Sequence, residues 1–118
     1  MAAKRASFDM DNWTTQLRKG LLELCVVSLL DRGEMYGYDL VKQLAGIRAL
    51  VITEGTVYPL LSRLKKAGLV ETRLAESSSG PARKYYVLTA QGKQTVEMMR
   101  TYWREVASGI EDIIEGSE

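Results

Sequence analysis

Hydroxyl, phenol and basic side chains are concentrated between residues 53 and 66, where they can donate hydrogen bonds to phosphates or to base edges of a nucleic acid. The donors are Thr56, Tyr58, Ser62, Arg63 and Lys66. Glu54 precedes them and can accept a hydrogen bond from a cytosine amino group. An ordinary solvated surface would carry the same residue types, so their function depends on the elements that position them.

An apolar stripe places these donors on one face of a predicted helix. The apolar positions recur at helical spacing and are Val57, Leu60, Leu61 and Leu64. Thr53 is placed to cap the first turn, and Gly68 follows the last apolar position. Pro59 is expected within about the first turn, where the N–H it lacks would have little or no intrahelical partner.

Two further cations, Arg83 and Lys84, follow the polar segment SSSGP. The flanking stretches 69–74 and 84–89 are rich in β-branched and aromatic residues and predict a hairpin with a polar tip. From this position the two cations can reach phosphates or a narrow minor groove. A hairpin end that only aids solubility is the alternative.

Several classes of chemistry are excluded by composition. The 118 residues include no histidine and one cysteine, Cys25, so metal hydrolysis and Ser/His or Cys/His catalysis are not expected. Cys25 lies in an apolar segment and is expected to be a small buried hydrophobe rather than a redox sensor. The net charge is +1, but residues 53–84 carry an excess of positive charge and residues 97–118 an excess of negative charge.

The remaining elements follow from hydrophobic periodicity. A helix is expected from Trp13 to about Arg32, capped by Asp11 or Asn12 and ended by a left-handed Gly33. A short helix is expected over 36–44, with a stub of strand over 47–52. The order of helix, helix, helix, hairpin and long helix predicts a mainly α fold with a minor β part, the winged helix-turn-helix.

The last helix, expected from about residue 89, carries an apolar seam spaced 3, 4, 3, 4, 3. The seam consists of Val96, Met99, Trp103, Val106, Ile110 and Ile113. Such a seam needs a cover, and a second copy of the chain is the simplest one. Trp103 at its centre has two interpretations, an anchor in a dimer core or one wall of a flat aromatic ligand site.

Four segments together resemble the PadR-like winged-helix transcriptional regulators. They are KGLLELCVVSLL, GEMYGYDLVKQL, ITEGTVYPLLSRLKKAGLVETR and SSGPARKYYVLTAQGK, and the resemblance covers residues 18–93. It implies a repressor that binds an inverted-repeat operator, often with ATGT and ACAT half-sites, and that reads the major groove with its third helix. The residues carried over are Tyr36 and Gly37, Thr53 to Pro59 including Gly55, Arg63, Arg83 and Lys84.

The resemblance also implies a dimer and, in some relatives, an effector. Short members of the family pair through the first and last helices, which adds Trp13, Leu17 and Leu21 to the seam as expected interface residues. Some bind planar aromatic or cationic drugs between paired tryptophans, and others bind phenolic acids. The ligand residues expected here are Trp103, Met99 and Leu17.

The main hypothesis is therefore a homodimeric DNA-binding regulator in the cytoplasm, a repressor relieved by a small ligand near the dimer interface. The expected division is an N-terminal arm over 1–12, a winged helix-turn-helix over 13–89 and a dimerisation helix over 90–118. No enzyme activity, metal, cofactor or membrane association is expected. A winged-helix module that binds a protein partner and no DNA is the alternative, suggested by the near-neutral net charge.

Overall fold

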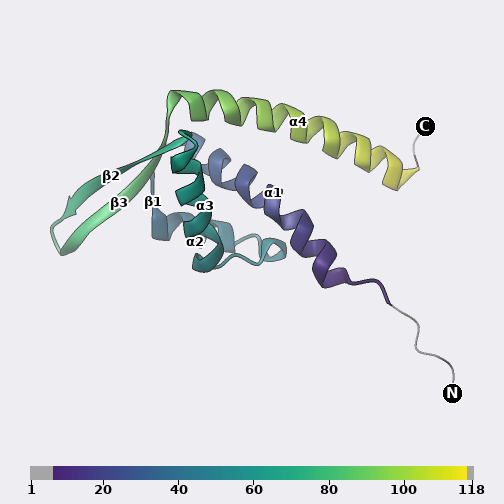
Figure 1. Ribbon diagram of the computed structural model, residues 1–118, viewed down its shortest axis with the longest axis horizontal. Helices are drawn as coiled ribbons and strands as arrows, with labels where there is room; N and C mark the ends of the chain where they lie inside the picture. Colours follow the sequence, from purple (N-terminus) through teal and green to yellow (C-terminus); the bar gives the residue numbers. More distant parts are fainter. Residues whose placement is uncertain (1–6, 117–118) are drawn as a thin grey trace, which may run out of the picture.

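Residues 7–116 are described by the structure, a computed structural model. The elements are α1 (Met10–Asp31), β1 (Met35–Tyr36), α2 (Gly37–Ala45), the 3₁₀ helix η1 (Arg48–Leu50), α3 (Glu54–Lys66), β2 (Val70–Ser77), β3 (Gly80–Leu88) and α4 (Ala90–Glu115). In Figure 1 the β2–β3 hairpin, the wing, projects to one side of the helices, and α1 and α4 extend to the other side. The predicted winged helix-turn-helix with a long last helix is confirmed.

The first helix begins earlier than predicted. Asp9, and not Asp11 or Asn12, caps α1, since its side chain accepts from the Asn12 backbone N–H at 2.9 Å. Residues 10–12 of the expected arm are therefore helical, and residues 1–6 lie outside the described residues. At the other end the helix closes on Arg32 in the right-handed conformation. Gly33 follows with φ +154°, a positive value that residues with a Cβ rarely adopt, although it lies far from the left-handed helical value.

The sheet has three antiparallel strands in the order β1-β3-β2. β1 was not predicted, because two residues are too few to show alternation, and Tyr36 was expected in the second helix. The two wing strands extend further toward the tip than the sequence indicated. The strand stub expected over 47–52 is wrong, since that segment holds η1 and ends at Val51 with φ +50°.

One hydrophobic core joins the second half of α1, α2, α3, the wing base and the start of α4. Val96 is fully buried in this core, so its expected place in a dimer interface is wrong. Gly92 allows α4 to pass close to the chain before β2, because a Cβ there would lie 2.2 Å from the Leu69 carbonyl oxygen. Thr89 fixes the same junction: its hydroxyl donates to the Gly68 carbonyl at 2.7 Å and accepts from the Gly92 N–H at 2.9 Å.

Pro59 lies deeper in α3 than expected. It is the sixth residue of the helix, so the N–H it lacks would have bonded to the Gly55 carbonyl, four residues earlier. The prediction that this N–H has no intrahelical role is therefore wrong. Gly55 is exposed, and its carbonyl accepts no hydrogen bond from Pro59, which has no N–H.

The first half of α1 and the second half of α4 diverge (Figure 1), and both halves carry exposed apolar side chains. Exposed large apolar residues on these halves include Met10, Trp13, Leu17, Trp103, Ile110, Ile113 and Ile114. Nearer the core, the two helices are joined by an ion pair of 2.9 Å between Arg100 and Asp31. No helix within residues 7–116 combines the length and the apolar character that crossing a membrane requires.

Candidate nucleic-acid interface

The outward face of α3 is narrow and polar. Gly55, Pro59, Ser62 and Lys66 follow one another at intervals of four, three and four residues, and all are exposed. This outward face combines a hydroxyl and an ammonium group with two positions, Gly55 and Pro59, that carry no bulky side chain. Because these two positions carry so little side-chain volume, the backbone of α3 can closely approach a groove of a nucleic-acid duplex.

Thr56 and Arg63 flank the outward face on the side of α1. The Thr56 hydroxyl serves the helix start, since it donates to the Thr53 carbonyl at 2.8 Å and accepts from the Thr53 N–H at 3.3 Å. Arg63 is exposed and has no ion-pair partner within the described chain. Of these two predicted contacts, Arg63 is therefore the freer donor.

Tyr58 flanks the outward face of α3 on the side of the wing, and its side chain is half-buried. Burial, with a contribution from the nearby Glu54 carboxylate, raises the pKa of the Tyr58 phenol, which therefore stays a neutral donor. Gly37 at the start of α2 is buried, and a Cβ there would approach the Tyr58 ring to 3.0 Å and the Tyr86 ring to 3.2 Å. The predicted contact of Gly37 with DNA is wrong, because its role is to let α2 approach these rings.

Aromatic rings and cations alternate at the base of the wing. Tyr36 of β1 and Tyr85 of β3 are paired across the sheet, with their ring centroids 6.0 Å apart. The Arg83 guanidinium lies 5.0 Å from the centroid of the Tyr36 ring, and that of Arg73 lies 5.1 Å from the centroid of the Tyr85 ring. We call these four residues the wing-base cluster.

Arg73 is also tied to the helix-turn-helix. Its guanidinium donates two hydrogen bonds to the Glu34 carboxylate just before β1, one of them from Nε to Oε2 at 2.9 Å. Because Arg73 donates these bonds, the pKa of Glu34 is lowered, and the pair stays charged at neutral pH. Since β3 lies between β1 and β2, this ion pair connects the two edges of the sheet.

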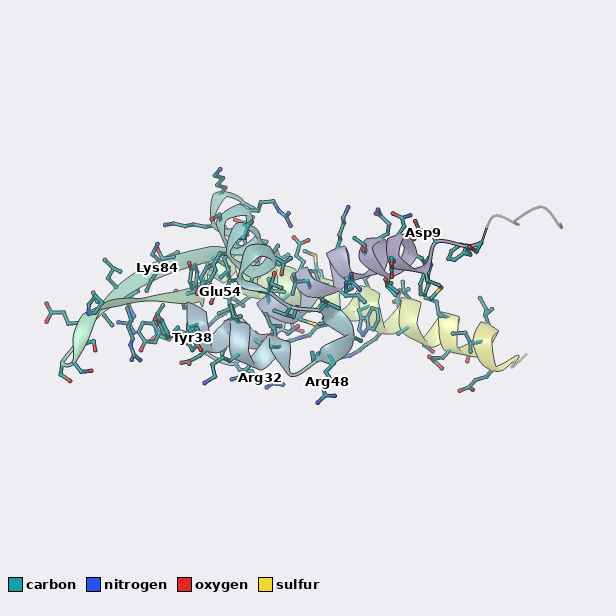
Figure 2. The ribbon with its side chains drawn as sticks, turned by 90° about the horizontal axis from the view of Figure 1, so that it is seen from below. Asp9, Arg32, Tyr38, Arg48, Glu54 and Lys84 are labelled. Carbon is teal, nitrogen blue, oxygen red and sulfur yellow. The ribbon has the colours of Figure 1, made fainter. Side chains whose placement is uncertain are left out.

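Arg83 and Lys84 face opposite sides of the wing, because neighbouring residues of a strand alternate. The sequence prediction grouped them, whereas the structure places Arg83 beside Tyr36 and leaves Lys84 on the other face. In Figure 2, Lys84, Glu54 and Tyr38 all lie toward the wing side of the molecule, and Asp9 lies at the far end of α1. Of the predicted DNA-binding residues, Glu54 and Lys84 thus lie on the same side of the molecule.

The expected ligand residues also lie together, in an apolar groove between α1 and α4. This α1–α4 groove has a volume of about 570 Å³ and is lined by Leu17, Leu21, Leu24, Met98, Met99, Tyr102, Trp103 and Val106, with Gln16, Gly20 and Thr95. Trp103 and Leu17 are each about half exposed. No group of three metal-ligating side chains stands close enough together in residues 7–116 to hold a metal ion.

A model of the transcriptional regulator PadR-like family matches residues 26–98, which is more than half of the chain. The chain belongs to this family. A solved PadR-like transcription factor from Bacteroides fragilis is 39% identical, with 86% of this chain and 98% of that chain covered and a TM-score of 0.71. A PadR-like transcriptional regulator from Bacillus cereus is 36% identical, with 86% and 99% covered and a TM-score of 0.79. A PadR-family regulator from Eggerthella lenta is 33% identical, with 89% and 91% covered and a TM-score of 0.75.

Membership of the PadR-like family confirms the resemblance found in the sequence, and its members are transcriptional regulators rather than enzymes. Membership of a family of transcriptional regulators is consistent with DNA-binding regulation by a protein that has an exposed α3 face and a wing.

Sequence reasoning missed the Glu34–Arg73 ion pair of this PadR-like chain, because its partners stand 39 positions apart and each looks like an ordinary surface charge. It also missed Tyr38, whose ring lies 5.5 Å from the Lys42 ammonium and 6.5 Å from the Tyr36 ring. The repeated tyrosines at 36 and 38 were the available signal. A third feature it missed is a basic groove between α1 and α3.

Proposed function

We propose that the protein is a homodimeric transcriptional repressor that binds an inverted-repeat operator through α3 and the wing. The observation that carries this proposal is the outward face of α3, which exposes Ser62 and Lys66 on a helix that precedes a wing with Arg73 and Arg83 at its base. An exposed helix of this kind next to a wing suits the major groove, with the wing on the flanking backbone. Action on operator DNA implies a cytoplasmic location.

The dimer is proposed from the diverging halves of α1 and α4. Their apolar residues lie open to solvent on both helices, and the remaining interface residues expected from the sequence are Trp13, Leu17, Leu21, Met99, Trp103, Val106, Ile110 and Ile113. A second copy would cover them and hold two α3 helices about one turn of DNA apart.

An effector is proposed to enter the α1–α4 groove. Leu17, Met99 and Trp103 offer an apolar lining with one large ring, and methionine repacks readily around ligands of different shapes. A planar aromatic molecule suits this lining. It relieves repression only if it binds the DNA-competent dimer less tightly than an alternative arrangement.

The test is a titration of the purified protein against a duplex from upstream of its own gene, at two salt concentrations, with a scrambled duplex as control. Tight, salt-sensitive binding that prefers the natural sequence, with two chains per duplex, is expected. Lys66→Ala should weaken it by several-fold, whereas Lys93→Ala, an equal loss of charge at the start of α4, should have little effect. If the protein binds both duplexes equally and weakly, and binds every other inverted repeat tested no better, the alternative is favoured, a winged-helix module that binds a protein partner and no DNA.

The effector proposal has a separate test. Trp103→Ala should abolish the binding of a planar aromatic cation such as ethidium, measured by calorimetry in the absence of DNA, because the variant loses a large ring of the groove lining. Intact DNA affinity together with an intact response in this variant would exclude the α1–α4 groove as the effector site.

A further inference from the structure

A second groove lies between the first half of α1, η1 and α3. This α1–α3 groove has a volume of about 560 Å³, within the range of roughly 300–1,000 Å³ that is usual for small-molecule sites. It shares only Gly20 with the α1–α4 groove among the residues that line the two. The α1 helix therefore separates two distinct grooves, and the second one lies beside the helix proposed to read DNA.

The apolar lining of the α1–α3 groove is aliphatic. It consists of Leu22, Leu50, Val51 and Leu60, and no aromatic side chain of residues 7–116 lines this groove. A flat aromatic ligand would find no ring to stack on here. A hydrocarbon chain, in contrast, can lie along these branched side chains and bury its surface against them.

The rim of the groove carries an excess of positive charge. Arg18 and Lys19 line it from α1 and Arg63 from α3, against a single acid, Glu23. None of these three cations forms an ion pair within residues 7–116, and Arg18 donates only to the neighbouring Thr15 hydroxyl, at 3.2 Å. A carboxylate would match this rim, because guanidinium groups donate two parallel hydrogen bonds to its two oxygens.

Val51 gives a second, independent sign of function at the same groove. Among residues 7–116 it is the one residue other than glycine with a positive φ, +50° with ψ +62°. A β-branched residue is strained in this conformation, and the side chain is nevertheless 58% exposed. Strained residues are concentrated at ligand-binding segments, and an apolar occupant of the groove would cover this side chain.

We propose that the α1–α3 groove binds an aliphatic carboxylate of medium chain length, with its chain on the leucines and Val51 and its carboxylate held by Arg18, Lys19 and Arg63. The bound carboxylate competes with DNA directly, because Arg63 also flanks the outward face of α3. This competition rests on the DNA-binding function proposed above. It needs no change in the arrangement of the dimer, unlike an effector in the α1–α4 groove.

Decanoate tests the site in the absence of DNA. The wild-type protein should bind decanoate in isothermal titration calorimetry, and should bind decanol, which lacks the carboxylate, and acetate, which lacks the chain, about tenfold more weakly or less. Arg18→Gln/Lys19→Gln should weaken decanoate binding by about tenfold. Arg32→Gln/Lys93→Gln is the matched control, with the same loss of charge at exposed positions outside the groove. Absence of decanoate binding, or equal binding by the two double variants, would overturn the proposal.

Two further variants locate the bound chain. Val51→Asn replaces an apolar wall while keeping the backbone conformation, because asparagine adopts a positive φ more readily than valine. It should retain the wild-type circular dichroism spectrum and bind decanoate several-fold more weakly. Trp103→Ala should bind decanoate as the wild type does. If Trp103→Ala loses decanoate binding and Arg18→Gln/Lys19→Gln retains it, the chain lies in the α1–α4 groove and the proposal is wrong.

Competition with DNA is measured separately, by anisotropy of a labelled operator duplex. Saturating decanoate should raise the operator dissociation constant of the wild type several-fold, and the same concentration should have little effect on Arg18→Gln/Lys19→Gln. An unchanged constant for the wild type would refute the competition. If the double variant instead lowers the salt dependence of DNA binding and keeps its decanoate affinity, the cations contact phosphates and the carboxylate site is excluded. A protein that binds decanoate through these cations but binds no duplex would refute the DNA-binding function and leave the site intact.

Discussion

Glu34→Gln should weaken DNA binding even though it removes a negative charge from the DNA-binding end of the molecule. Glu34 accepts two hydrogen bonds from Arg73, and the pair connects the segment before β1 to the outer strand of the wing. Glutamine keeps one acceptor oxygen, so the variant loses one of the two hydrogen bonds and the ionic attraction. The wing should then sample more orientations relative to α3.

Two effects of opposite sign compete in this variant. Loss of a carboxylate close to the DNA phosphates favours binding. A more mobile wing disfavours binding, because more conformational entropy is lost when the wing becomes ordered in the complex. The side chains of Arg73 and Glu34 are 50% and 40% exposed, so the pair is a surface ion pair, a class that contributes little free energy. Its two hydrogen bonds make it stronger than a typical member of this class. We expect an operator dissociation constant about two- to fivefold higher than that of the wild type.

The assay is fluorescence anisotropy with a labelled operator duplex at constant salt. Glu71→Gln is the matched control, because Glu71 lies two residues before Arg73 on the same face of β2 and forms no ion pair within residues 7–116. It loses the same charge without loosening the wing, and its affinity should be equal or higher. Tighter binding by Glu34→Gln, to the level of Glu71→Gln, would refute the role of the ion pair in positioning the wing.

The same pair gives a pH dependence with a definite sign. Arg73 lowers the pKa of Glu34 in the folded protein, so the stabilisation is present above the ordinary glutamate pKa and is lost as the pH falls through the lowered value. Wild-type and Glu34→Gln proteins should therefore differ in wing order at neutral pH and converge only under strongly acidic conditions. Amide hydrogen exchange of the wing strands is the measurement, and a difference that vanishes already at pH 6 would contradict the assignment.

Three further predictions concern the rest of the fold. Gly92→Ala should lower the free energy of unfolding by about 2–3 kcal/mol in a urea titration, since the clash with the Leu69 carbonyl outweighs the gain of about 1 kcal/mol in helix propensity. Gly109→Ala is the control, and it should raise the free energy of unfolding because there is open space around Gly109. Arg83→Ala should reduce the slope of log K against log salt by about 1.8, one phosphate contact for each protomer, and an unchanged slope would remove Arg83 from the DNA contacts. Cys25 should react slowly with a thiol reagent at pH 7, because burial raises its pKa; a rate like that of free cysteine would contradict this.

The sequence predicted the fold well wherever the signal was local. The stripes that define α1, α3 and α4 recur every three or four residues over several turns, and Thr53 lies at the start of α3 as the predicted cap does. The errors occur where one contact between distant segments decides the outcome. β1 exists only because Met35 and Tyr36 pair with Tyr86 and Tyr85, and nothing within two residues can indicate that pairing.

The candidate site was predicted as a set of residues but not as an arrangement. Exposed polar positions on α3 follow from the helical period, so Ser62 and Lys66 could be selected from sequence. Whether a selected glycine faces DNA or the core depends on tertiary packing, and for Gly37 it is the core. The apolar seam of α4 has the same ambiguity: its first position, Val96, covers the protein's own core, and only the later positions stay open.

The two grooves give α1 a central place in any coupling between ligand and DNA. The second half of α1 is fixed in the core, whereas its first half borders both grooves and is largely exposed. A ligand that wedges α1 away from α4 would move Arg18 and Lys19, which line the basic groove between α1 and α3 together with Arg63 of the proposed DNA-reading helix. Such a shift lowers DNA affinity only by the difference in ligand affinity between the two arrangements, so a tight ligand that binds both equally would leave repression unchanged. The proposed DNA-reading helix and the proposed effector site are thus connected through one helix, and a search for effectors should select compounds by their effect on DNA release rather than by affinity alone.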